Sequence, residues 1–413
     1  MQEGVLIVAK RNFSNDDKLG RLGYAKFIEI LLFDTKKYKR DDDTNSFVLA
    51  LDSPWGTGKT YFIEMLYDYL ENSAELDVQF NVFKYNAWQN DFWDNAFEPL
   101  MHTFLSDDKF VMPNKNRLNS LASKLKICIP SIAKGILIQP IRLVAGEKAA
   151  EDTRQTIDTA VDWFADINSI FPDYQIFTEN IKILKDVLAE YVELIGHSRR
   201  LVIIIDELDR CKPTFAIQTL EIVKHLFDVE GISFVFSLDI QQLSHSIKCV
   251  YGNGMDSVGY IMRFFDYIFK MPTPDIKSFI QNTIEGKPIK LEHKDLIEFI
   301  DNFLHITRFL NLSLRDITTI YTSFLALVEF ELVDNPNVIL YYNYLALLCL
   351  KYKAPTCFEA LMLGKANAEH DNIIKNIFRS SSEFRNLIRV NDFLSKINVS
   401  VKQDVTCKSS IKV

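Results

Sequence analysis

The stretch from Phe47 to Thr60, FVLALDSPWGTGKT, constrains the fold of this chain more than any other part of it. It begins with five apolar residues, Phe47 to Leu51, a length and composition typical of a buried strand. A glycine-containing turn follows, and the periodic apolar run from Tyr61 to Leu70 predicts a helix. Strand, glycine-rich loop and helix in this order form the context that a phosphate-binding loop requires.

The residues of this loop predict how a nucleotide is held. Backbone N–H groups and the positive end of the helix dipole bind phosphate oxygens. We expect Lys59 to reach the β- and γ-phosphates and the Thr60 hydroxyl to ligate Mg²⁺. The candidate nucleotide-binding residues are Pro54, Trp55, Gly56, Thr57, Gly58, Lys59, Thr60 and Tyr61. The alternative is a glycine-rich turn that binds nothing, and the length and context of the motif argue against it.

A second stretch carries two carboxylates at the end of a buried strand. Leu201 to Ile205 is aliphatic without a polar break, as in a parallel sheet that is covered on both faces, and Asp206 and Glu207 follow it. Ligands bind at the carboxyl ends of such strands. Asp206 is therefore the candidate Mg²⁺ residue, directly or through water. Glu207 is the candidate residue that orients or deprotonates the attacking water, a role worth about 10²–10⁴ in rate.

Three further runs complete a predicted sheet. Val78 to Tyr85, Ile232 to Leu238 and Tyr267 to Met271 have the composition of strands, and a helix is expected over Thr214 to Phe227. Strands and helices alternate, which predicts an α/β fold with a parallel sheet and right-handed crossovers. Beyond Pro274 the pattern is mostly helical.

Composition limits the class of protein. The 413 residues are 48% hydrophobic and 25% charged, as in soluble proteins with two or three domains. The net charge of −8 argues against a protein that coats nucleic acid by bulk charge. The six cysteines form no C-x-x-C pair, and the N-terminus has no secretory signal pattern. We therefore expect a cytoplasmic protein with reduced thiols; contact with a membrane surface is left open.

The motifs together resemble those of the KAP-family P-loop NTPases, which include bacterial phage-exclusion proteins and a large neuronal membrane scaffold. The matching segments are residues 17–25, 54–60, 85–89, 205–211, 236–239 and 312–316. Two positions depart from the family pattern. Ser53 replaces the first glycine of the loop motif, and Glu207 stands where aspartate is common.

The resemblance implies a three-layer α/β/α P-loop NTPase core of the additional-strand type, in which one strand separates the phosphate-loop strand from the acidic strand. It also implies ATP, with Mg²⁺, as the nucleotide. The expected function is an ATP-binding and ATP-hydrolysing switch that controls assembly in bacterial anti-phage defence. Two alternatives remain open: a nucleotide-binding scaffold with negligible hydrolysis, and an ATP-dependent nucleic-acid translocase or remodeller.

Two arginines are additional catalytic candidates. Arg315 lies in the Ser-x-Arg element that resembles the family's, and we expect it to contact the γ-phosphate. Arg210 follows the acidic strand and could complete a neighbouring subunit's site in a homo-oligomer. An internal ion pair of Arg210 with Asp209 or Asp239 is the alternative. A partner effector protein is a further possible binding partner.

The predicted domains are 1–90, the first part of the NTPase core; 91–200, a helical insertion; 201–274, the rest of the core; and 275–413, a helical C-terminal domain. The insertion is longer than a crossover needs. Its run from Ile127 to Val144 contains two charges and two prolines, so no membrane span is predicted. Residues 112–148 are basic. Three interpretations stay open: a solvated surface, a contact with a membrane surface, and a contact with nucleic acid.

Overall fold

The structure, a computed structural model, describes residues 11–377 except 41–43, 73–74, 77–78, 107–119, 122, 134–171, 197–198, 286–288, 290, 332–337, 364 and 366. The chain forms two compact units. The first contains the sheet and runs to Pro272 apart from Gly56–Gly58, and the second contains the helices from Thr273 onward. The predicted boundaries of the domains stay predictions.

Five parallel strands form one sheet in the order β2-β3-β4-β1-β5. Their bounds are β1 Phe47–Asp52, β2 Gln79–Asn86, β3 Arg199–Asp206, β4 Ile232–Leu238 and β5 Tyr267–Lys270. The predicted α/β fold with a parallel sheet is confirmed. So is the additional strand, because β4 pairs with both β1 and β3 and separates them.

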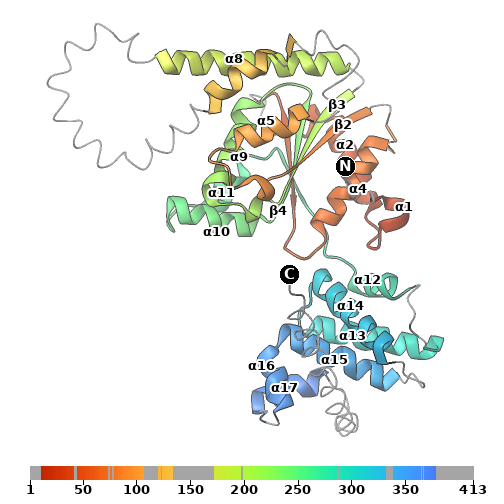
Figure 1. Ribbon diagram of the computed structural model, residues 1–413. Coiled ribbons are helices and arrows are strands. Elements are labelled where there is room, and N and C mark those ends of the chain that lie inside the picture. Colours follow the sequence, from red (N-terminus) through yellow and green to blue (C-terminus); the bar gives the residue numbers. More distant parts are fainter. Residues whose placement is uncertain are drawn as a thin grey trace, which may run out of the picture. The chain divides into compact units, whose positions relative to one another are not determined.

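Helices cover both faces of the sheet (Figure 1). The face that carries Phe47, Leu49 and Leu51 packs against α2 Leu22–Phe33 and α4 Lys59–Asn72. The opposite face, with Val48 and Ala50, packs against helices that include α5 Phe97–Ser106, α8 Pro172–Ile195, α9 Pro213–Leu226 and α10 Ile240–Tyr251. Because β1 is buried on both sides, its continuous apolar sequence follows from its position.

Short elements complete the first unit. They are α1 Phe13–Asp16, α3 Thr35–Tyr38, η1 Trp88–Asn90, η4 Leu208–Arg210 and α11 Ser257–Met262. The predicted insertion is helical in α5, at 123–133 and in α8. Of the basic segment 112–148, the structure describes only residues 120–121 and 123–133. Among the described helices, none has the length and apolarity needed to cross a membrane.

The described residues of the second unit are mostly helical, as predicted. It contains α12 Ile276–Ile284, α13 His293–Phe309, α14 Leu314–Glu331, α15 Val338–Lys353, α16 Pro355–Met362 and α17 Ala368–Ile377. The aromatic run on α15, Tyr341, Tyr342 and Tyr344, is buried, with exposed fractions of 2–4%. These rings therefore belong to the core of the unit rather than to a binding platform.

Candidate nucleotide-binding site

The phosphate loop joins the end of β1 to the start of α4. Gly56 and Gly58 have φ of +79° and +85°, in the left-handed region that glycine adopts without steric cost. Of the described non-glycine residues only Glu207 and Asn311 have positive φ, so Ser53 does not need a glycine's conformational freedom. The Ser53 N–H donates to the Leu238 carbonyl of β4 at 3.2 Å. Serine at this position is thus compatible with the loop.

Lys59 lies at the first position of α4, and its ammonium is held within the loop. It donates to the carbonyl oxygens of Ser53 and, at 3.4 Å, of Pro54. It also lies 3.8 Å from Asp209 Oδ2. Burial lowers the pKa of Lys59, and the nearby carboxylates, Asp209 first among them, partly oppose this effect. A desolvated ammonium surrounded by acceptors in this way is suited to receive an anion in exchange.

The Asp206 carboxyl meets the requirements of a Mg²⁺ ligand. It is buried at the end of β3, where Oδ1 accepts the Glu207 N–H at 2.9 Å. Burial raises the pKa of Asp206, and the neighbouring Ser237 and Thr60 hydroxyls lower it. By hydrogen-bond geometry, however, Oδ2 has no partner among the described residues. A buried carboxylate oxygen without a partner, near the Thr60 hydroxyl, fits a hard cation with oxygen ligands.

Glu207 is held at both carboxylate oxygens. Its Oε1 pairs with Arg210 Nη1 at 2.7 Å, and its Oε2 accepts Asn86 Nδ2 from the end of β2 at 2.9 Å. Its φ of +62° is strained for a non-glycine residue, at a cost of about 1–3 kcal/mol. Strain of this kind persists where neighbouring contacts fix the backbone, and it concentrates at functional sites. In this conformation both carboxylate oxygens of the candidate base are bound by residues of the same chain, Arg210 and Asn86.

Arg210 therefore forms an internal ion pair, and its partner is Glu207 rather than Asp209 or Asp239. Its guanidinium also lies over the Trp88 ring, 5.4 Å from the centroid. The Trp88 side chain is half exposed.

The predicted side chains do not all lie at the loop. Tyr61 points toward the N-terminal residues: its hydroxyl donates to Asp16 at 3.5 Å and its ring lies under Arg11, 4.3 Å away. Arg315 is the second residue of α14 in the second unit. The contact of Arg315 with a γ-phosphate stays a prediction.

Sequence reasoning missed the roles of two residues, Asn86 and Asp209. Both residues lie inside motifs that carry the family resemblance, and this was the signal that could have marked them as functional. Their contacts could not be predicted, because their partners are distant in sequence. Asn86 contacts Glu207 from a different strand. Asp209 Oδ2 accepts the Trp55 indole N–H at 2.7 Å and the Asp239 backbone N–H at 2.8 Å.

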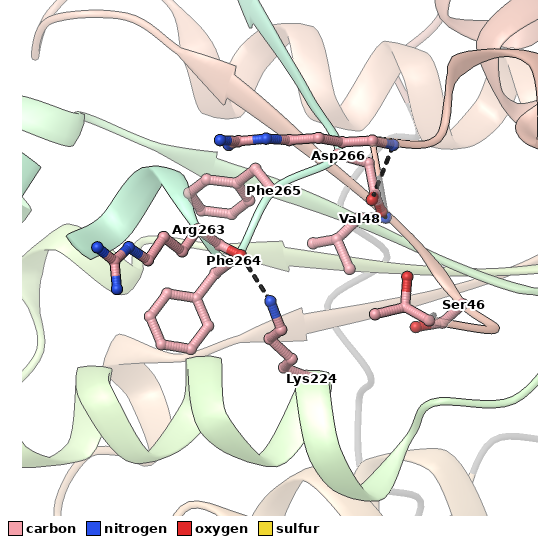
Figure 2. Close-up of a pocket in the computed structure, with 9 residues that line it drawn as sticks. Ser46, Val48, Lys224, Arg263, Phe264, Phe265 and Asp266 are labelled. Atoms are coloured by element: carbon pink, nitrogen blue, oxygen red, sulfur yellow. Dashed lines mark hydrogen bonds between the residues drawn. The ribbon is translucent and has the colours of Figure 1, made fainter. Parts of the chain in front are cut away.

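A cavity of about 300 Å³ lies at the opposite, amino end of the sheet (Figure 2). Its lining includes Ser46, just before β1, and Asp266, just before β5. Lys224 donates to the Arg263 carbonyl there at 2.7 Å, and Asp266 accepts the Val48 N–H at 2.8 Å. Because the phosphate loop follows the carboxyl end of β1, this cavity is separate from the candidate site.

The chain matches a known protein family over most of its length. Residues 24–329 match the model of the KAP family P-loop domain. The phage T7 exclusion protein of Escherichia coli (strain K12) is 19% identical over 243 residues, which cover 56% of this chain and 30% of that protein. This chain therefore matches less than a third of that relative's length.

Among solved structures, the ORC2 protein of Aeropyrum pernix aligns with 12% identity over 79% of this chain and 68% of that chain. The TM-score is 0.41 for its ADPNP–ADP complexes and 0.37 for its ADP form. TM-scores this low support no inference about this chain.

Proposed function

Because this chain belongs to the KAP family of P-loop domains, we propose that it binds ATP with Mg²⁺ and hydrolyses it as a molecular switch. The observation that carries the proposal is the arrangement around strands β1 and β3. The phosphate loop follows one, Asp206 ends the other with Glu207 next to it, and Lys59 at the start of α4 lies 3.8 Å from Asp209, three residues beyond β3. The two predicted halves of the site thus lie together.

Each residue has a distinct task in this proposal. The loop N–H groups and Lys59 bind the phosphates, and Lys59 exchanges its carbonyl contacts for phosphate oxygens. Thr60 and Asp206 hold the cation, which when bound neutralises charge on the phosphates. Glu207 orients the attacking water and accepts its proton once an oxygen is released from Asn86 or Arg210.

A direct test titrates purified protein with ATP, ADP and GTP by calorimetry, with Mg²⁺ and with EDTA, and measures phosphate release. We expect ATP to bind, Mg²⁺ to be needed for phosphate release, and GTP to bind more weakly. A protein that binds none of these nucleotides contradicts the proposal. Binding without phosphate release favours the nucleotide-dependent scaffold, and stimulation of turnover by DNA or RNA favours the translocase.

The internal pair of Arg210 with Glu207 gives a prediction about subunit cooperation. Because Arg210 serves its own chain, Arg210→Ala should change turnover only about fivefold, the scale of one partly exposed ion pair. An arginine supplied to a neighbouring subunit is worth about 10³–10⁵ in rate. Specific activity should stay flat on dilution, and a mixture of Arg210→Ala and Lys59→Ala proteins should recover no turnover. Recovery in the mixture would show that Arg210 completes a neighbour's site.

We also propose that the nucleotide state controls assembly of this protein in anti-phage defence. The similarity to the phage T7 exclusion protein supports this, although the match covers 30% of that protein. The test compares the size distribution of the purified protein with and without ATP–Mg²⁺, and phage plating on bacteria that express the wild type or Lys59→Ala. We expect larger species with ATP and fewer plaques with the wild type alone. Equal plating on both strains would contradict the role in defence.

A further inference from the structure

One oxygen of Asp209 connects the phosphate loop to the rest of the candidate site. Oδ2 accepts the Trp55 indole N–H at 2.7 Å and the Asp239 backbone N–H at 2.8 Å, and it lies 3.8 Å from the Lys59 ammonium. The Asp209 side chain is only 2% exposed. A buried carboxylate is stable only when it is well paired, so these three neighbours hold it and it holds them.

We propose that Asp209 is a positioning residue that holds Trp55 and attracts Lys59 in the nucleotide-free loop, and that ATP binding transfers Lys59 from Asp209 to the phosphates. The proposal rests on the proposed nucleotide binding. It assigns two separate tasks to one side chain. Hydrogen-bond acceptance fixes the loop through Trp55, and negative charge retains the Lys59 ammonium.

The negative charge of Asp209 opposes the binding of an anion. The second task can therefore be measured as a change in ATP affinity. Asp209 attracts the Lys59 ammonium across 3.8 Å and therefore competes with phosphate for it. The same carboxylate also repels the phosphate oxygens. A neutral acceptor at position 209 removes this competition but keeps the bonds to Trp55 and Asp239.

The first experiment measures ATP affinity by calorimetry for the wild type and Asp209→Asn, with Mg²⁺ and with EDTA. We expect Asp209→Asn to bind ATP about fivefold more tightly under both conditions, the scale of one charge interaction at this separation. A gain that persists in EDTA separates the effect from metal coordination. Tighter binding is a result that loss of a merely structural residue would not give.

Two comparisons make the test specific to Lys59. In a Lys59→Met background, the gain from Asp209→Asn should shrink, because no ammonium is left for Asp209 to retain and only the repulsion of the phosphate oxygens is removed. Asp52→Asn is the matched control, because Asp52 also acts on Lys59 electrostatically, although less than Asp209 does. The Asp52 Oδ1 atom accepts the Ile240 N–H, so this carboxylate too is held by a backbone group. Asp52→Asn should give a smaller gain than Asp209→Asn. Equal gains would indicate a general charge effect and overturn the proposal.

The second experiment follows hydrogen exchange of backbone amides in residues 53–60 without nucleotide. Asp209→Ala and Trp55→Phe should exchange faster than the wild type, because each removes one partner of the indole bond. Asp209→Asn should keep the wild-type rate, because its amide oxygen still accepts. Trp55 is 51% exposed, so Trp55→Phe opens no core cavity. Unchanged exchange in Trp55→Phe would overturn the anchoring task.

The outcomes also separate this proposal from the proposed function. A wild type that binds no ATP overturns both. A wild type that binds ATP, together with Asp209→Asn protein of equal or weaker affinity, overturns only the positioning role.

Discussion

Replacing Lys59 by alanine is expected to weaken ATP binding by about 10²–10⁴-fold while the fold persists. The ammonium would make two hydrogen bonds to phosphate oxygens, each worth about 1.5–3 kcal/mol because both groups are charged. The fold should survive because Lys59 is the first residue of α4, where alanine is favourable, and because burial lowers its pKa, so the ammonium is costly there. Calorimetry measures the affinity, and thermal unfolding checks the fold.

The control for this variant is Lys36→Ala. Lys36 pairs with Glu230, its side chain is 83% exposed, and Glu230 lies just before β4, at the amino end of the sheet. The same change in net charge at that end should leave ATP affinity unchanged. If Lys59→Ala unfolds at the wild-type temperature and still binds ATP with wild-type affinity, the loop is not a nucleotide site.

Replacing Glu207 by glutamine is expected to reduce turnover by about 10²–10⁴-fold and to leave ATP binding within a fewfold of the wild type. The amide cannot accept a proton from water, so the general-base contribution is lost. Its oxygen can still accept from Asn86 or Arg210, so the geometry around β2 and β3 should be kept. Phosphate release measured at saturating ATP isolates the chemical step from binding.

Glu230→Gln is the matched control, because Glu230 is an exposed glutamate that pairs with Lys36. It should retain full turnover. Turnover of Glu207→Gln near that of the wild type would mean that the base lies elsewhere.

Local sequence patterns predicted much of the candidate site. The loop, Lys59 and Thr60 follow one another directly, and Asp206 and Glu207 end a strand whose apolar run is unmistakable. Such features depend on spacing along the chain, so they can be read without coordinates. Short elements leave a weaker pattern, and the helix α3 at Thr35–Tyr38 was not among the predicted elements. Four residues carry too little periodicity to predict a helix.

The sequence by itself determined the strands, their parallel direction and the residues at their carboxyl ends, because burial on both faces requires continuous apolar runs that local composition records. Only the tertiary structure decided which side chains meet at that edge. It placed Asn86 and Arg210 on the two oxygens of Glu207, and Trp55 and Lys59 beside Asp209. Glu207 and Arg210 are only three residues apart, but the other contacts join side chains from different strands and loops. Their geometry depends on rotamers and packing across the sheet, which no spacing along the chain encodes.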